Sequence, residues 1–206
     1  MFFDSVDNPL IYLITDGETT AGNFTEKKSR ILELITISAE NKVSLIQIRE
    51  KKLPARLVFE LAREVAEITR KSQTKLLVND RADIALAAEA DGVHLTSHSL
   101  SVKIIRRNFP KDFIVGVSTH TIETAETAKQ NGADFITFSP IFDTPAKGKL
   151  HGIEKLRQVC EKLKPFPVIA LGGIDETNYK SVLENGASGF AAIRFLNNAE
   201  NFKLFL

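Results

Sequence analysis

The chain has 206 residues, of which 43% are hydrophobic, and its 27 basic and 26 acidic residues leave a net charge of +1. This length suits one domain with a substantial core, so we expect a single domain over residues 1–206. A charge near zero argues against nucleic acid or an anionic membrane surface as a partner, and no apolar run approaches the ~20 residues of a membrane span. One cysteine excludes a disulfide within the chain. The start has no signal-like apolar region, so we expect a cytoplasmic protein.

Short apolar runs recur along the chain, each followed by polar residues and separated by stretches long enough for a helix. They are Leu10–Thr15, Ser44–Ile48, Lys75–Val78, Gly92–Leu95, Phe113–Val117, Phe135–Phe138, Pro167–Leu171 and Gly189–Ile193. The runs are nearly continuous in apolarity, as is typical of parallel strands buried on both faces. Eight β-α repeats predict a TIM barrel, a (β/α)8 fold whose chemistry lies where the strands end.

The segments between these runs have helical periodicity. In Leu57–Ile68 the apolar residues fall on one stripe. We expect Ser99 to cap a helix over Leu100–Asn108, and Asp175 to cap a helix over Glu176–Glu184. An open doubly wound sheet is the alternative fold, but it usually has five or six strands and a Gly-rich phosphate turn after the first. Here that strand ends in Thr15-Asp16-Gly17, and the strand count favours the barrel.

Cationic and amide side chains follow the second strand. Strand alternation sends Gln47, Arg49 and Lys51 to the same side, which at the carboxyl end of a barrel strand faces the mouth. Together they predict an anion site, since an arginine can hold two phosphate oxygens at once. We interpret Lys52 as an ordinary solvated side chain.

Acidic residues and histidines follow the third and fourth strands. Asp80 suits Mg²⁺, which favours one or two carboxylates with phosphate oxygens and water, and it suits a helix cap equally well. Asp83 is expected to be structural, in the first helical turn or paired with Arg81. His94 and His98 lack the spacing of a helical metal pair, so zinc is not expected.

The remaining strand ends add hydroxyls, an imidazole and glycines. Ser118 and His120 suit phosphate binding or proton transfer, although a structural role for His120, with Thr119 or Thr121 capping the next helix, is equally reasonable. Lys147 lies in a Pro/Gly-rich segment that suits a closing loop, whose lysine could neutralise a leaving pyrophosphate, or an ordinary surface loop with solvated lysines. The strand-seven and strand-eight ends, where barrels often bind phosphate, contribute a last group of candidates: Gly172, Gly173, Ile193 and Arg194.

Taken together, these motifs resemble those of the thiamine phosphate synthase family and its relative, the thiazole tautomerase (TenI-like) branch. The resemblance covers nearly the whole chain, and its motifs occur in order: QIREK at Gln47–Lys51, VNDRADIAL at Val78–Leu86, DGVHL at Asp91–Leu95, GVSTH at Gly116–His120, SPIFDTPAK at Ser139–Lys147 and ALGGI at Ala170–Ile174. In this family pyrophosphate leaves an aminopyrimidine methylene, and a thiazole nitrogen captures the resulting cation.

The resemblance also implies residue roles. Asp80 matches a magnesium ligand, Thr144 part of the thiazole-phosphate loop and Gly173 the glycine at that second phosphate. The pyrimidine diphosphate site implied by the family consists of Gln47, Arg49, Lys51, Asn79, Ser118 and Lys147. The implied partners are these two small-molecule substrates, and a homodimer is left open.

The chain departs from the family pattern at three places. Ser99 stands where the synthases have a second magnesium-binding Asp, Ala146 replaces a threonine of the thiazole-phosphate loop, and Ile193-Arg194 replaces a Val-Ser pair. The tautomerase branch uses a histidine at the position of His120 and often lacks residues that this chain retains. The retained diphosphate cluster favours a synthase; a tautomerase or a non-catalytic phosphate-ligand binder is the alternative.

Overall fold

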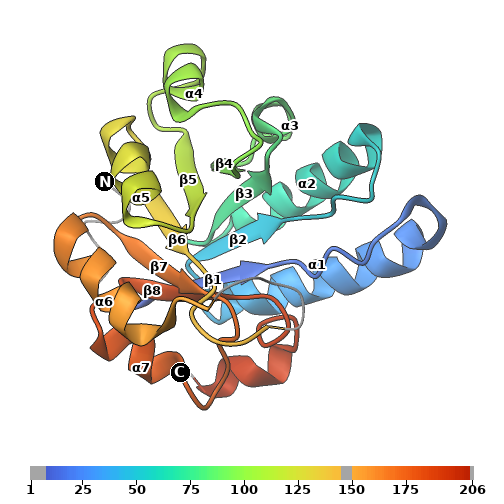
Figure 1. The fold of residues 1–206 in the computed structure, drawn as a ribbon. Helices are drawn as coiled ribbons and strands as arrows, with labels where there is room; N and C mark the ends of the chain where they lie inside the picture. The colour runs from blue at the N-terminus through green and yellow to red at the C-terminus, as the bar shows by residue number, and fades with distance from the viewer. Residues whose placement is uncertain (1–7, 145–149, 205–206) are drawn as a thin grey trace. The chain divides into compact units, whose positions relative to one another are not determined.

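Eight strands form a closed parallel barrel in the computed structural model, which describes residues 8–144 and 150–204 (Figure 1). Their order around the barrel is their order in the sequence, with a helix following most strands. The predicted TIM barrel is therefore confirmed. The strands are β1 (Leu10–Ile14), β2 (Leu45–Ile48), β3 (Lys75–Asn79), β4 (Gly92–Leu95), β5 (Ile114–Thr119), β6 (Phe135–Phe138), β7 (Val168–Leu171) and β8 (Gly189–Ala192).

The helices bury the apolar stripes that their sequences predict. In α2, for example, Leu57, Leu61 and Val65 are buried, while Arg63 is exposed. The helices are α1 (Phe24–Glu40), α2 (Ala55–Thr69), α3 (Ala82–Ala87), α4 (Val102–Asn108), α5 (Ile122–Gln130), α6 (Gly152–Leu163) and α7 (Tyr179–Glu184), with short 3-10 helices at Ala21–Asn23 and Ala199–Leu204. Among the described residues, we find no helix with the length and apolarity needed to cross a membrane.

The predicted cap of α4 is wrong. This helix begins at Val102, with Ser101 at its N-cap position. Ser99 instead accepts a hydrogen bond from the backbone N–H of Thr96 through Oγ, at 2.7 Å. A serine hydroxyl competes for nearby backbone groups, and here it closes a tight turn before the helix starts.

The predicted start of α7 is also wrong. The helix begins at Tyr179, and Asn178 occupies its N-cap position. Asp175 forms a turn of its own, because its Oδ1 accepts the backbone N–H of Thr177 at 2.9 Å, while Asn178 Oδ1 accepts the N–H of Asp175 at 3.0 Å. An Asp can initiate a turn as readily as a helix, and sequence alone does not separate the two.

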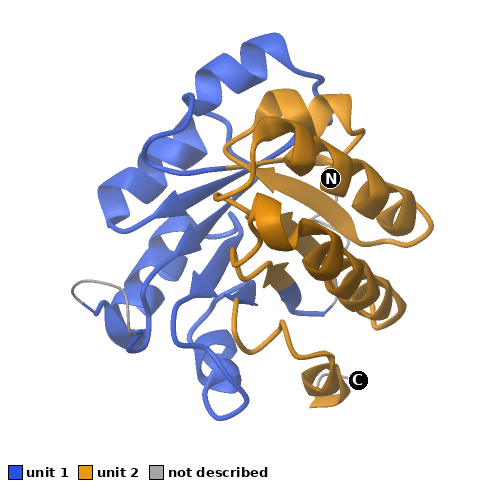
Figure 2. Ribbon diagram, turned by 90° about the vertical axis from the view of Figure 1, so that its right-hand side faces the viewer, with its two compact units in different colours: residues 1–11, 95–192 blue, residues 12–94, 193–206 orange. Residues whose placement is uncertain are grey.

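The chain divides into two compact units (Figure 2). Unit 1 comprises residues 1–11 and 95–192, and unit 2 comprises residues 12–94 and 193–206. Within unit 2, β2 pairs with β3, and α2 packs against α1 and α3. Within unit 1, β5 to β8 form a continuous parallel ladder, and α6 packs against α5 and α7. All four residues of β2 and of β6 are buried, as expected for strands covered on both faces.

Candidate active site

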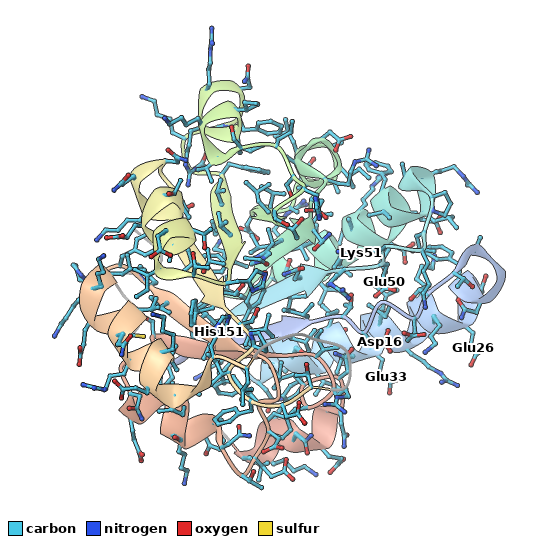
Figure 3. All side chains as sticks on the ribbon, in the orientation of Figure 1. Asp16, Glu26, Glu33, Glu50, Lys51 and His151 are labelled. Atoms are coloured by element: carbon cyan, nitrogen blue, oxygen red, sulfur yellow. The ribbon has the colours of Figure 1, made fainter. Side chains whose placement is uncertain are left out.

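Arg49 is held at the end of β2 by the segment that follows β1. Its backbone N–H donates to Thr15 Oγ1 at 2.8 Å. The neighbouring Glu50 is buried, and its carboxylate accepts the backbone N–H groups of Gly17 at 3.2 Å and Thr19 at 3.0 Å. Figure 3 shows Glu50 where β2 ends, in unit 2. A buried carboxylate bound to two amides ties the segment after β1 to the end of β2, next to the backbone of Arg49.

Gln47 belongs to a buried chain of polar side chains in unit 2. Its Nε2 donates to Tyr12 Oη at 2.6 Å, and Tyr12 Oη lies 3.1 Å from His94 Nδ1. Burial raises the pKa of Tyr12 above its ordinary value and lowers the pKa of His94 to about 3. Tyr12 is therefore a neutral phenol and His94 a neutral imidazole at physiological pH. Nδ1 of the neutral ring faces the hydroxyl of Tyr12.

The lysines after β2 lie beyond the strand. β2 ends at Ile48, so strand alternation does not set the direction of Lys51, which is exposed (Figure 3). Its place in the anion site stays a prediction. Lys52 forms an exposed ion pair with Glu18 at 3.1 Å, which confirms its interpretation as a solvated side chain.

Asp80 has a strained backbone directly after β3. Its φ of 60° is in the left-handed region that non-glycine residues rarely adopt, and its N–H donates to the carbonyl of His94 at 2.9 Å. Asn79 Nδ2 donates to Asp80 Oδ2 at 2.7 Å, which orients the carboxylate. Arg81, not Asp80, occupies the N-cap position of α3, and the role of Asp80 as a magnesium ligand stays a prediction. Asp83 pairs with Arg81 as predicted, at 2.5 Å.

In unit 1, β5 carries two of the candidate residues to its carboxyl end. Ser118 is half-buried, one residue before the end of the strand. Next to the strand, His120 Nδ1 lies 2.7 Å from the carbonyl oxygen of Ser139. A carbonyl can only accept, so Nδ1 carries the proton and, in the neutral ring, Nε2 is the basic nitrogen. Thr121 caps α5 by accepting the N–H of Thr124, in agreement with one of the two predicted caps.

The glycines after β7 are required by the segment that follows β6. A Cβ on Gly172 would lie 2.7 Å from Pro140 Cα, and one on Gly173 would lie 2.6 Å from the carbonyl oxygen of Asp143. Both glycines also have positive φ, 106° and 66°. The lack of side chains therefore serves close packing within unit 1, and binding of phosphate by these glycines stays a prediction.

Thr144 is the last described residue before the predicted closing loop. Its Oγ1 is buried and has no hydrogen-bond partner within the described ranges 8–144 and 150–204. A buried hydroxyl without a partner is costly, and a ligand oxygen is one way to satisfy it. Lys147 lies outside the described residues.

The residues after β8 return to unit 2. Ile193 is half-buried and Arg194 is exposed. Asn197 holds this turn, since its Nδ2 donates to the carbonyls of both Ile193 and Ile14 at 2.7 Å. The end of the chain is thereby fixed to β1 within unit 2.

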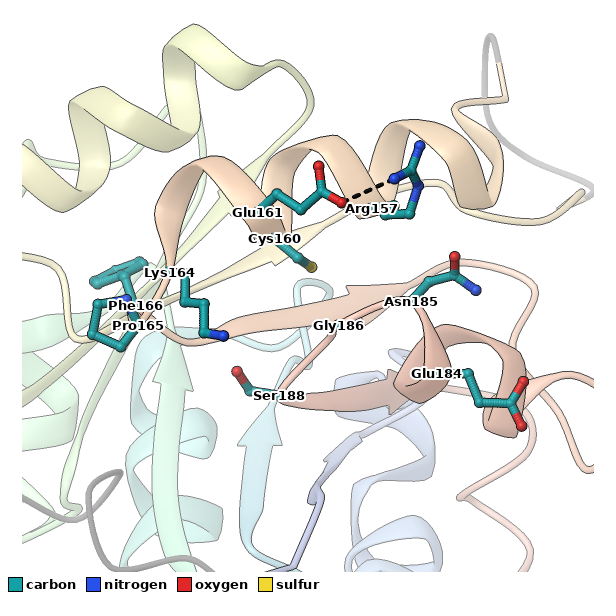
Figure 4. Close-up of a pocket in the computed structure, with 10 residues that line it drawn as sticks. All are labelled: Arg157, Cys160, Glu161, Lys164, Pro165, Phe166, Glu184, Asn185, Gly186 and Ser188. Carbon is teal, nitrogen blue, oxygen red and sulfur yellow. Dashed lines mark hydrogen bonds and ion pairs between the residues drawn. The ribbon is translucent and has the colours of Figure 1, made fainter.

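A pocket of about 490 Å³ in unit 1 lies at the other ends of the strands (Figure 4). Phe166 and Ser188 in its lining precede β7 and β8, so it opens at their amino ends. Arg157 in its wall is already paired with Glu161 at 2.9 Å. Barrel enzymes carry their chemistry at the carboxyl ends, so we do not assign the reaction to this pocket.

Tyr12, Gly17 and Glu50 take part in holding the candidate residues, and sequence reasoning missed all three. Glu50 stands inside the QIREK motif, between Arg49 and Lys51. A single acidic residue between two cationic ones is a sequence signal for a carboxylate that is buried and hydrogen-bonded. Tyr12 lies within an apolar run, where its hydroxyl requires a hydrogen-bond partner once buried.

The barrel carries cationic, amide and carboxylate side chains after the carboxyl ends of its strands, which is where TIM-barrel enzymes place their active sites. Residues 11–196 match the family model described as thiamine monophosphate synthase, and the chain belongs to this family. This confirms the resemblance seen in its motifs.

Individual relatives agree with the family. The chain is 43% identical over 187 residues to a putative thiamine-phosphate synthase 2 of Aquifex aeolicus, covering 90% of this chain and 96% of that protein. It is 39% identical to a thiamine-phosphate synthase of Caldanaerobacter subterraneus, covering 89% and 84%. Its structure is similar to that of thiamine phosphate pyrophosphorylase from Pyrococcus furiosus, with a TM-score of 0.80, 29% identity and 95% of each chain covered.

Proposed function

We propose that the protein is a thiamine-phosphate synthase, a transferase that joins an aminopyrimidine diphosphate to a thiazole phosphate in thiamine biosynthesis. The identity of 43% and 39% to relatives with that name supports this function. The observation that carries it is the anchored backbone of Arg49, whose N–H donates to Thr15 and whose neighbour Glu50 binds the segment after β1. A guanidinium projecting from an anchored strand end suits a diphosphate.

The reaction breaks the bond between the pyrimidine methylene carbon and the diphosphate oxygen, and the electron pair leaves with pyrophosphate. The amino group delocalises the positive charge that remains, and the thiazole nitrogen then donates its lone pair to form the new C–N bond. Negative charge thus develops on the leaving group. Cations placed near the leaving group stabilise that charge, and we assign this role to Arg49, Lys51 and Lys147.

Gln47, Asn79 and Ser118 complete the proposed pyrimidine diphosphate site. Gln47 is almost fully buried, with 1% of its surface exposed, and Asn79 and Ser118 are half-buried at strand ends. Neutral amides and a hydroxyl at such positions can orient a heterocycle and its first phosphate without adding charge.

Asp80 would hold a Mg²⁺ ion in this site. Its carboxylate is oriented by Asn79 at 2.7 Å, and oxygen ligands of this kind suit magnesium. Ser99 stands where the family has a second carboxylate, and a neutral hydroxyl supplies no second negative charge at that position. Among the described residues no group of three or more His, Cys, Asp or Glu side chains could hold a metal. The ion would therefore depend mainly on substrate phosphate oxygens, whose charge it would neutralise.

The thiazole phosphate is assigned to Thr144, Gly172, Gly173, Ile193 and Arg194. The buried Oγ1 of Thr144, for which the described residues provide no hydrogen-bond partner, supports this assignment. Arg194 is exposed and offers a cation where the family has a serine hydroxyl. A guanidinium can bind a phosphate with two parallel hydrogen bonds, so this substitution is compatible with phosphate binding.

A thiazole tautomerase is the second candidate function, and the geometry of His120 favours it. Its Nδ1 is engaged by the carbonyl of Ser139, so Nε2 is the nitrogen that could take up and return a proton. This candidate requires no metal, and replacing His120 with Ala would abolish it.

One assay separates these functions. Purified protein is given both substrates, with and without Mg²⁺, and release of pyrophosphate and formation of the coupled product are followed. A synthase releases one pyrophosphate per product in the presence of Mg²⁺. Turnover of a carboxythiazole phosphate alone would support the tautomerase, and tight binding of the pyrimidine diphosphate without any turnover would identify a non-catalytic binder.

A further inference from the structure

Thr137 on β6 has a buried hydroxyl without a hydrogen-bond partner. The residue is 0% exposed, and its Oγ1 bonds to nothing in the described part of the chain. The strand around it is otherwise apolar, with Ile136 before it and Phe138 after it. A valine would fill the same space without a polar atom to desolvate, so this hydroxyl lowers stability unless a ligand or a water molecule binds it.

Thr137 lies on the inner face of the strand ladder from β5 to β8. The next residue, Phe138, has its ring centroid 4.9 Å from that of His151, which occupies the N-cap position of α6. Phe138 therefore points to the helix layer, which lies outside the strands (Figure 1). Because successive side chains of a strand point to opposite faces, Thr137 points inward.

The strand register places Thr137 beside a residue of the proposed substrate site. Thr137 is paired with Ser118 on β5, and both residues belong to unit 1. Paired residues of neighbouring parallel strands point to the same face, and their strands lie about 5 Å apart. Ser118 is half-buried whereas Thr137 is fully buried, so Thr137 lies deeper. A pyrimidine diphosphate bound at Ser118 would therefore meet Thr137 with its most buried part.

The heterocycle is the part of this ligand that suits such a position. Burying a diphosphate beside a neutral hydroxyl would be costly, whereas a pyrimidine has polar atoms without a charge. A hydroxyl both donates and accepts, so it can pair with a ring nitrogen or an amino group whichever way its proton points. A water molecule fits less well, because a buried water needs about two to four polar partners, and the other residue paired with Thr137 is the apolar Ile169.

We propose that Thr137 is a substrate-binding residue whose hydroxyl forms a hydrogen bond with the heterocycle of the pyrimidine diphosphate, and thereby favours this ring over one without polar atoms. The inference rests on the proposed function for the identity of the substrate. It explains a threonine at a position where packing alone would favour valine, since the cost of the unpaired hydroxyl is offset when the ligand binds.

Two substitutions of Thr137 should separate stability from affinity. Thr137→Val retains the shape of the side chain and removes the hydroxyl, so the Tm of the ligand-free protein should rise. The Kd for the pyrimidine diphosphate, measured by calorimetry with Mg²⁺ present, should rise about tenfold, as for the loss of one buried hydrogen bond. Thr137→Ser retains the hydroxyl but loses a buried methyl group, so the Tm should fall while the Kd stays within about twofold of wild type.

Thr119→Val is the matched control on the neighbouring strand. Thr119 is also buried, but its Oγ1 donates to the carbonyl oxygen of Thr137 at 3.0 Å. Loss of this bond should lower the Tm and leave the Kd for the pyrimidine diphosphate unchanged. An unchanged Kd in folded Thr137→Val, or an equal rise of the Kd in Thr119→Val, would overturn the proposal.

Two further ligands test which part of the substrate meets the hydroxyl. Inorganic pyrophosphate lacks the ring, and benzyl diphosphate has a ring without polar atoms. With Mg²⁺ present, each should bind wild type and Thr137→Val with equal affinity, because neither offers the hydroxyl a partner at the position of the ring. A tenfold loss of affinity for either ligand in Thr137→Val would overturn the assignment to the heterocycle.

These measurements separate the role of Thr137 from the proposed function. If wild type binds the pyrimidine diphosphate without turnover and Thr137→Val weakens that binding, the proposed function fails and the role of Thr137 holds. If wild type forms the coupled product and the Kd is the same in Thr137→Val, the proposed function holds and the role of Thr137 fails. No binding of the pyrimidine diphosphate by wild type would overturn both.

Discussion

The guanidinium of Arg49 lies against Gly17, at a point where any side chain would crowd it. A Cβ on Gly17 would be 3.1 Å from Arg49 Nη1 and 3.2 Å from the Arg49 carbonyl oxygen. Gly17 also has a φ of 79°, a left-handed backbone conformation that residues with a Cβ rarely adopt. The lack of a side chain at Gly17, after β1, therefore leaves room for the guanidinium of Arg49, after β2.

Gly17→Ala should consequently impair diphosphate binding. We expect a loss of about 1–2 kcal/mol in the free energy of unfolding from the left-handed backbone, and a raised KM for the pyrimidine diphosphate because Arg49 is displaced. Thermal unfolding and steady-state kinetics measure the two effects. Gly22→Ala is the matched control, since its nearest atom would be 3.9 Å away. An unchanged KM in Gly17→Ala would contradict the role given to Arg49.

Glu50→Gln should destabilise the same segment. The substitution retains the shape of the side chain but replaces the carboxylate that accepts the N–H groups of Gly17 and Thr19 with a neutral amide. We expect the free energy of unfolding to fall by about 1–2 kcal/mol. We expect a lower Tm together with a lower kcat/KM. Glu18→Gln changes an exposed carboxylate paired with Lys52 and should change stability by less than about 0.5 kcal/mol. Equal effects of the two substitutions would argue against a special role for Glu50.

Asp80→Asn should weaken the response to magnesium. Loss of the carboxylate is expected to raise the Mg²⁺ concentration for half-maximal rate about tenfold, because one charged oxygen ligand is lost. Titration of activity against Mg²⁺ measures this. Asp83→Asn, which only breaks the exposed pair with Arg81, should leave the titration as in wild type. If both variants behave alike, Asp80 is not a metal ligand.

Lys147→Ala should lower kcat more than it weakens substrate binding. A cation that meets charge formed in the transition state contributes little to the ground state. Single-turnover rates and equilibrium binding of the pyrimidine diphosphate separate the two quantities. Lys149→Ala, two positions further along the sequence, is the control. A raised Kd with an unchanged single-turnover rate in Lys147→Ala would reassign this lysine to simple binding.

Cys160 should react slowly with thiol reagents in the folded protein. Burial raises its pKa to about 12, so at pH 8 we expect labelling about a thousandfold slower than for an ordinary thiol with a pKa near 8.5. The pKa of Cys160 is higher in the folded than in the unfolded protein. Its contribution to the free energy of unfolding is therefore fully present below about pH 8.5 and is lost as the pH rises toward 12. Labelling should become fast in denaturant, and Cys160→Ala should abolish it. Fast labelling of the native protein would show that the thiol is accessible.

The amino-acid sequence by itself determined the fold and the family. Continuous apolar runs are typical of strands buried on both faces, as in β2, and apolar stripes at helical spacing are typical of helices that cover a sheet, as in α2. Eight alternations of such runs and stripes are compatible with few folds. The strand-end motifs also predicted which residues form an anion site. Hydrophobic periodicity and composition are properties of short segments, so they can be read from the sequence without the tertiary structure.

Only the tertiary structure decided how those residues are held. The bond between Tyr12 and His94 joins residues 82 positions apart, and the bond between Gly17 and Glu50 joins residues 33 positions apart. The left-handed backbone of Asp80 and the turn of Asp175 likewise depend on which of several possible partners is near. A polar side chain has many acceptable partners along a chain, and only the packing of the strands selects one.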